Sequence, residues 1–160
     1  MKISKQYIAG LFDGEGSVSI IKSNADCYLD KNGIKKNTIR YRLTAAICMT
    51  DNKVLDYLRE KYGGTGHLRK GVNTELKFWK VGNIQAITFL KDIQKYSIIK
   101  QEQIKLAIQF REFKSTLLQG KFVDKDGNRR RYSQETYQRF NRFYSNMHII
   151  NSYKVPYLAV

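Results

Sequence analysis

The stretch that organises this chain is residues 7–16, with the sequence YIAGLFDGEG. It mixes apolar with small residues and ends in two carboxylates, Asp13 and Glu15, which one glycine separates. Gly10 and Gly14 are four residues apart, so on a helix they share one face. Each glycine costs a helix about 1 kcal/mol relative to alanine. The pair therefore indicates a packing reason, because a face without side chains lets another backbone come close.

Glu15 stands where this helix is expected to end. The C-terminal end of a helix carries a partial negative charge, which disfavours a carboxylate at that position. A bound cation would offset the repulsion. The sequence therefore indicates Glu15 as a candidate cation ligand.

The composition points to a nucleic-acid partner. The 160 residues include 29 Lys and Arg against 14 Asp and Glu, a formal net charge of +15. A charge of this size argues about partners, with nucleic acid first and an acidic membrane surface second. No run approaches the roughly 18 apolar residues of a membrane span, and we expect no membrane partner.

Length and composition also bound the domain count and the compartment. We expect one domain over residues 1–160, with a core to about residue 118 and a helical extension over about 119–160. The two cysteines, Cys27 and Cys48, have no metal-site spacing and fit a reducing, intracellular compartment. No targeting peptide fits the first residues. Abundant Lys, Ile, Asn and Tyr suggest an AT-rich coding genome, such as that of a mitochondrion or chloroplast.

The residues after Gly16 change to the period-two pattern of β-strands. In residues 17–23, Val18 and Ile20 share one face, and the opposite face carries Ser17, Ser19, Ile21 and Ser23. A second strand is predicted over residues 38–49, where apolar residues alternate with Arg40, Arg42 and Thr44. One face of this pair is therefore apolar. The other is either a solvated sheet face or a surface that lies in a DNA groove, where Arg commonly contacts guanine.

The remaining elements repeat this order. A helix over 52–62 is capped by Thr50 or Asp51, and Gly63–Gly64 ends it. Two strands follow, 66–70 and 75–81, for which Leu76 and Phe78 are predicted on one face and Glu75, Lys77 and Trp79 on the other. Helices are predicted over 83–96, 98–118 and 133–150, with Asn83, Ser97 and Ser133 as their caps. The order is a duplicated αββ unit. It predicts an α+β fold with a four-stranded antiparallel sheet, helices on one face and a basic open face.

Residues 8–16 resemble the motif that names the LAGLIDADG homing endonucleases, with Ile for the first Leu, Phe for Ile, and Gly-Glu for Ala-Asp. By element order the likeness covers about residues 7–110. It implies the αββαββα fold of that family, whose strands form a saddle along the major groove of double-stranded DNA. Family members with one motif copy are homodimers, so the resemblance implies a long pseudo-palindromic target. It also implies a dimer interface at Ala9, Gly10, Phe12 and Asp13.

The resemblance also implies a catalytic site. Glu15 and the Gly14 carbonyl would bind Mg²⁺ or another divalent cation, and each subunit would cut one DNA strand, giving a staggered double-strand break. Residues 100–103, KQEQ, resemble a Lys-Gln-x-Gln stretch of the family, which assigns Lys100 to the scissile phosphate. The family often has a water-binding glutamine at the end of the second strand, where this chain has Met49. Either Thr50 or Gln103 takes over that task, or the enzyme is slow.

The predicted DNA-binding residues lie on the polar face of the strands. They are Ser19, Ile21, Ser23, Arg40, Arg42, Thr44, Arg69, Lys70, Glu75, Lys77 and Trp79. Two alternatives to a homing-type endonuclease stay open. One is a maturase that binds its own intron RNA, and the other is a DNA-binding protein whose catalysis has decayed.

Overall fold

A computed structural model describes residues 3–29, 35–70, 75–119 and 132–152 of the chain. The elements, in order, are α1 (Lys5–Glu15), β1 (Gly16–Leu29), β2 (Lys35–Met49), α2 (Asn52–Tyr62), β3 (Thr65–Lys70), β4 (Glu75–Gly82), α3 (Asn83–Gln94), α4 (Gln101–Gln119) and α5 (Gln134–Ser152). This is the predicted order, and the predicted α+β class is confirmed.

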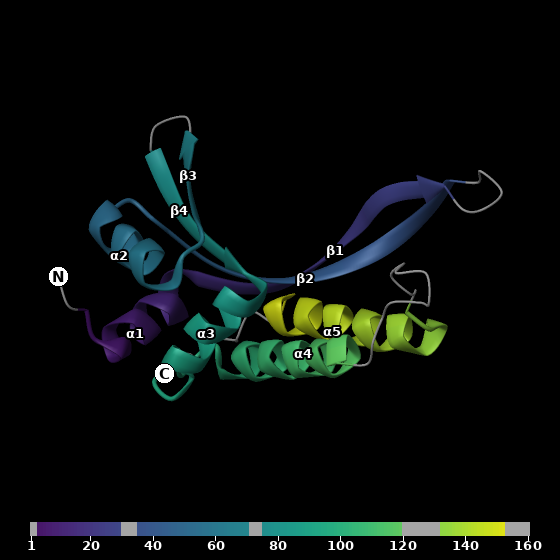
Figure 1. The fold of residues 1–160 in the computed structure, drawn as a ribbon. Helices are drawn as coiled ribbons and strands as arrows, with labels where there is room; N and C mark the ends of the chain where they lie inside the picture. The colour runs from purple at the N-terminus through teal and green to yellow at the C-terminus, as the bar shows by residue number, and fades with distance from the viewer. Residues whose placement is uncertain (1–2, 30–34, 71–74, 120–131, 153–160) are drawn as a thin grey trace.

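The four strands form one antiparallel sheet in the order β1-β2-β4-β3. Figure 1 shows the sheet bent into a saddle, with α1, α3, α4 and α5 on its convex side and α2 beside β3 and β4. No helix lies over the concave side among the elements drawn (Figure 1). The predicted arrangement, with helices on one face and the other face open, is therefore confirmed.

The open face of β1 and β2 carries the residues that the alternation predicted. Val18 and Ile20 are buried opposite Ala45 and Leu43, while Ser17 and Ser19 face away from the core beside Ala46 and Thr44. A clean alternation fixes the register, because a slip of one residue would exchange the two faces.

The face prediction for β4 was wrong. Trp79 has 0% exposure and pairs with Ile47, and its indole N–H donates to the Gly63 carbonyl at 2.8 Å. Lys77 follows the same alternation, so Phe78 and Lys80 take the open positions. The sequence of β4 has apolar residues at both parities. The larger buried ring decides the register, because the indole contributes more buried apolar area than any alternative there.

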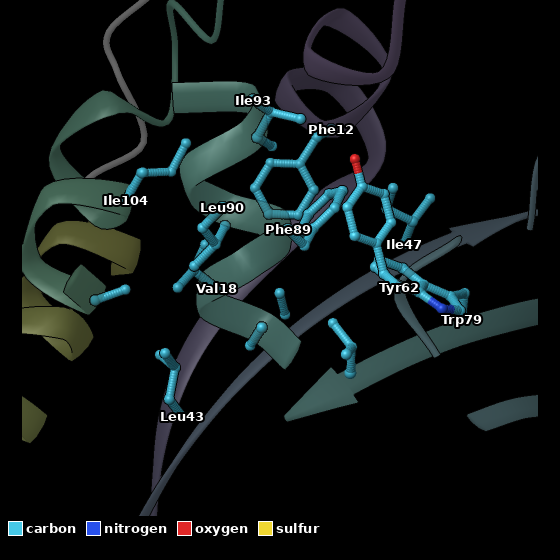
Figure 2. Packing of buried hydrophobic residues seen from close by; sticks show 14 of the residues in the cluster. Phe12, Val18, Leu43, Ile47, Tyr62, Trp79, Phe89, Leu90, Ile93 and Ile104 are labelled. Carbon is cyan, nitrogen blue, oxygen red and sulfur yellow. The ribbon is translucent and has the colours of Figure 1, made fainter. Parts of the chain in front are cut away.

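The core lies between the sheet and the helices (Figure 2). Phe89 of α3 contacts Phe12 edge-on, with ring centroids 5.1 Å apart, and Trp79, at 4.9 Å. From α5, Phe140 and Met147 are buried in the same cluster. The helix that was expected to extend the domain beyond about residue 118 thus packs on the same core as the described elements before it.

The helix ends show which cap predictions were right. Asp51 caps α2 by accepting from the Lys53 N–H at 2.8 Å, and Gly63 ends that helix with φ +73°. By contrast, Gly82 rather than Asn83 is the N-cap of α3. Among the described residues, none of the helices combines the length and the apolar character that crossing a membrane requires.

Candidate active site

The end of α1 is fixed by a close backbone approach. Gly16 is the C-cap of this helix and donates its N–H to the Phe12 carbonyl. A Cβ at Gly16 would lie 2.4 Å from that carbonyl oxygen and 2.2 Å from the Phe12 ring. Only glycine fits at this close approach. With glycine there, the chain passes directly from α1 into β1.

This turn leaves Glu15 exposed at the junction of α1 and β1. The first ladder pair of β1 and β2 is Gly16 and Ile47, so Glu15 stands at the end of the β1–β2 ladder. Gly14, the residue before it, is also exposed. The predicted metal ligands are thus exposed at the point where α1 passes into β1.

Asp13 points the opposite way and is 8% exposed. Its carboxylate accepts the backbone N–H groups of Ile98, Ile99 and Lys100 at 2.6, 3.2 and 3.2 Å, and the Ser97 hydroxyl at 2.5 Å. Burial raises the pKa of Asp13, but these four hydrogen bonds together outweigh burial and leave the pKa below its ordinary value. Asp13 is therefore an ionised carboxylate that holds the chain leading into α4.

This contact corrects the prediction for the start of α4. Ser97 was expected to cap a helix beginning at residue 98, but α4 begins at Gln101, and the Ser97 hydroxyl donates to Asp13. The N–H groups of residues 98–100 donate to the carboxylate of a distant helix. That partner cannot be seen in the local sequence.

Lys100 lies beside the same helix end. Its ammonium donates to the Asp13 backbone carbonyl at 2.5 Å. Burial lowers the pKa of the Lys100 ammonium, while the negative charges of Asp13 and Glu15 partly offset that effect. The structure thus places the Lys100 ammonium at the end of α1, on the backbone carbonyl two residues before Glu15.

The residues around this pair differ from the prediction. Met49 has the parity of the buried face and packs against the core, so Cys48 is the last residue of β2 on the open face. Cys48 follows Ile47, the partner of Gly16, and therefore lies at the same end of the sheet as Glu15.

The amide of Gln101 bridges the α3–α4 turn by donating to the Gln94 and Ser97 carbonyls. Gln103 buries its Oε1 without a hydrogen-bond partner in the described part of the chain.

The open face of the sheet is polar and positively charged. Arg40, Arg42 and Lys80 are exposed on it. Between them lie the less exposed side chains of Ser19, Ile21, Ser23 and Thr44. These six predicted residues of β1 and β2 therefore share one surface, and Lys80 joins them although the prediction missed it. Lys80 follows Trp79 in the strand, so placing Trp79 on the buried face would have placed Lys80 on the open face.

Two predicted DNA-binding residues, Lys77 and Trp79, do not join this group, and three more lie outside the residues whose side chains the structure describes. Trp79 is buried, and Lys77 helps line a hollow of about 220 Å³ between α2 and the outer strands. Arg69 and Lys70 pair with Leu76 and Glu75 in the backbone ladder, and the side chains of Arg69, Lys70 and Glu75 lie outside the described set.

The predicted dimer interface also changes. Ala9, Phe12 and Asp13 are buried inside the chain's own core, so they cannot form the surface of a paired helix. Gly10 is exposed, and a Cβ built at Gly10 or at Gly14 meets no atom within 4 Å. Tyr7, 53% exposed, precedes them on the same open side of α1.

The donor set at this helix end fits a hard divalent cation only in part. Glu15 supplies an exposed carboxylate, and helix C-termini present carbonyl oxygens, which together are the ligands that Mg²⁺ prefers. In the described residues, His, Cys, Asp and Glu side chains do not gather in threes close enough to hold a metal. At this end of α1 the oxygen donors among the described residues are therefore one carboxylate and the carbonyl groups of the helix end.

Comparison with known proteins gives the fold. A scan of family models and a search of curated proteins find no match. Solved structures do match: the homing endonuclease I-CvuI with DNA has 15% identity and a TM-score of 0.65 over 94% of this chain and 83% of its own. The LAGLIDADG homing endonuclease I-GzeII with its DNA target has 18% identity and a TM-score of 0.63, over 92% of this chain and 46% of its own.

A third homing endonuclease, I-TnaI, matches 94% of this chain and 97% of its own, with 14% identity and a TM-score of 0.57. At such identities the likeness shows the fold alone. The chain has the fold of LAGLIDADG homing endonucleases, as the motif at residues 8–16 implied. The coverage also extends past residue 110, where the sequence resemblance ended.

Proposed function

We propose that this protein is a site-specific DNA endonuclease of the homing type, which makes a metal-dependent, staggered double-strand break as a homodimer. The observation that carries the proposal is the position of Glu15. It is an exposed carboxylate at the end of the β1–β2 ladder, two residues beyond the backbone carbonyl to which the Lys100 ammonium donates. A carboxylate and an ammonium so placed suit phosphodiester hydrolysis.

The open saddle supports DNA as the substrate. It is concave, and no helix among the elements drawn lies over it (Figure 1). Arg40, Arg42 and Lys80 are exposed on it. A net charge of +15 favours binding to the phosphate backbone and release of its counterions. I-CvuI, I-GzeII and I-CeuI, which share the fold, were solved with DNA.

The open side of α1 supports a dimer. Gly10 and Gly14 present backbone without side chains, and two copies can pair there around a two-fold axis. Pairing would bring the two Glu15 carboxylates together. In I-GzeII the matched portion is 46% of the chain, which leaves room for a second unit of similar size.

Glu15 and the Gly14 carbonyl would hold a divalent cation, with DNA phosphate and the second copy completing the shell. Such a cation supplies activation of water and stabilisation of the leaving oxygen. The I-CvuI structures were solved in the presence of Mg or Ca. In hydrolysis the water oxygen forms a bond to phosphorus while the bond to the 3′ oxygen breaks. The Lys100 ammonium stabilises the charge that develops on the phosphate.

A cleavage selection tests the proposal. The protein is incubated with a randomised duplex library and Mg²⁺, and cleaved molecules are recovered and sequenced. We expect specific double-strand cuts by the wild type and none by Glu15→Gln, with DNA affinity within about tenfold, or ~1.4 kcal/mol. Cleavage by Glu15→Gln would remove Glu15 from the site. Specific binding without any cut would favour a decayed DNA-binding protein.

A further inference from the structure

We propose that Asp13 is a positioning residue. Its four hydrogen bonds to residues 97–100 set the position of the Lys100 ammonium relative to Glu15. The consequence for cleavage rests on the proposed function. Asp13 itself is 8% exposed and its carboxylate is occupied by residues 97–100, so it does not touch substrate. It acts through Lys100.

The carboxylate holds its partners with both oxygens. Oδ1 accepts from the Ser97 hydroxyl and the Lys100 N–H, and Oδ2 accepts from the N–H groups of Ile98 and Ile99. An ionised carboxylate only accepts hydrogen bonds, so it suits four converging donors. An amide in its place would turn a donor toward two of them.

Lys100 is tied to α1 a second time. Its ammonium donates to the backbone carbonyl of Asp13, while its N–H donates to the Asp13 side chain. One residue therefore fixes both ends of Lys100. Glu15 lies two residues further along the same backbone, so the separation of Lys100 from Glu15 depends on this double contact.

A second carboxylate that joins helices through hydrogen bonds, Asp92, provides the matched control; we call its contacts with Lys5 and Tyr62 the Asp92 clamp. Asp92 of α3 accepts from Lys5 at the start of α1, at 2.9 Å, and from the Tyr62 hydroxyl of α2, at 3.0 Å. It also ties α1 to its neighbours, but at the end of the helix opposite Glu15. Loss of Asp92 removes a clamp without touching Lys100.

The first test separates rate from affinity. Asp13→Asn, Ser97→Ala and Asp92→Asn are compared with the wild type on the duplex that the wild type selects from the randomised library. We expect Asp13→Asn to slow single-turnover cleavage about 100-fold, because small misplacements of catalytic groups have such costs. DNA affinity should stay within about threefold. Ser97→Ala, which loses one of four bonds, should show a smaller loss in rate, and Asp92→Asn should cleave at the wild-type rate.

A second test needs no cleavage. The ¹⁵N–¹H signal of the Lys100 ammonium is recorded in the free protein, where a hydrogen bond to a carbonyl slows proton exchange. We expect the signal in the wild type and in Asp92→Asn, and its loss in Asp13→Asn. If Asp13→Asn does not fold, Ser97→Ala serves in its place, with a weakened signal expected.

The outcomes distinguish the two proposals. A wild type that cuts no duplex defeats the proposed function, while the ammonium signal still decides whether Asp13 positions Lys100. An unchanged signal in the folded Asp13 variant overturns the positioning role. A cleavage loss equal in the Asp13 and Asp92 variants, or a loss confined to affinity, also overturns it.

Discussion

Gly16 is the residue that fixes the end of α1. Its added Cβ would meet the Phe12 backbone carbonyl, which cannot move without unwinding the helix. We predict that Gly16→Ala lowers the free energy of unfolding by about 2 kcal/mol or more. Urea unfolding followed by circular dichroism measures this change.

Gly66 gives the control for this prediction. A Cβ there would meet its nearest atoms at 3.8 Å, an ordinary contact distance. Gly66→Ala should therefore change the stability by much less than Gly16→Ala. Equal effects would mean that the close approach at Gly16 has no energetic importance.

Lys100 is expected to act on the rate of cleavage. Lys100→Met keeps much of the apolar stem but removes the ammonium, so the charge at the phosphate loses its partner. We predict a rate loss of about 100-fold with little change in DNA affinity. Lys105→Met, which removes an exposed ammonium paired with Glu102 on the same helix, should cleave normally. Wild-type cleavage by Lys100→Met would exclude Lys100 from the site.

The sequence predicted single residues best where a motif carried them. The motif and the KQEQ run predicted Glu15 and Lys100, and the Lys100 ammonium contacts the backbone carbonyl two residues before Glu15; their catalytic roles stay a prediction. The role of Asp13 could not be predicted in full, because its partners are 84 to 87 residues away. Trp79 was misplaced because both parities of β4 are apolar, and only the pairing with Ile47 decides between them.

At the scale of elements, α1 presents an open face that carries Gly10 and Gly14. Replacing Gly10 by alanine should have opposite effects on the stability of one chain and on the affinity of a dimer. In one chain, Gly10→Ala should raise helix stability by up to about 1 kcal/mol, because the Cβ meets no atom and alanine favours the helix. In a dimer paired on this face, the same methyl separates the two helices. We predict that Gly10→Ala stabilises the monomer and weakens the dimer.

Light scattering across protein concentration, together with urea unfolding at low concentration, measures both effects. Ala substitution at Gln6, which is exposed in the first turn of the same helix, is the control for helix propensity. A variant that dimerises as tightly as the wild type would exclude Gly10 from the interface.

The clamp at Asp92 joins α1, α2 and α3 and gives a pH prediction. The hydrogen bond from Lys5 lowers the pKa of Asp92 below 3.8, burial opposes this, and the Tyr62 hydroxyl lowers it further. The folded pKa is below the unfolded one, so the clamp stabilises the chain above pH 3.8 and loses its effect as the pH falls further.

We therefore expect the stability gap between the wild type and Asp92→Asn to be constant near neutral pH and to shrink in acid. Urea unfolding of both proteins from pH 7 down to about pH 3 measures the gap. A gap that persists or widens in acid would show that the Asp92 charge does not stabilise the folded state.

Element order was the most predictable feature, because the sequence changes clearly between periods of two and 3.6 residues. The faces of β1 and β2 followed from their alternation. The start of α4 did not follow, since the N–H groups of residues 98–100 bind a carboxylate on a distant helix. The element against which α5 packs could not be predicted, because Phe140 and Met147 show a helical stripe but not its partner.

At the scale of the whole molecule, the proposed function joins the saddle to the end of α1. The concave face carries exposed Arg40, Arg42 and Lys80, and Glu15 lies at the end of the β1–β2 ladder. One chain offers only one carboxylate there, and a duplex has two strands. For a double-strand break, each copy of the chain must therefore cut one strand.

Mixed dimers test this claim most directly. Wild-type and Glu15→Gln chains are refolded together in equal amounts and given supercoiled plasmid that carries the selected target, with Mg²⁺. About half of the dimers should then be mixed, and we predict that these nick the plasmid, whereas wild-type dimers linearise it and Glu15→Gln dimers leave it intact. A mixture that yields linear plasmid without nicked circles would contradict the account.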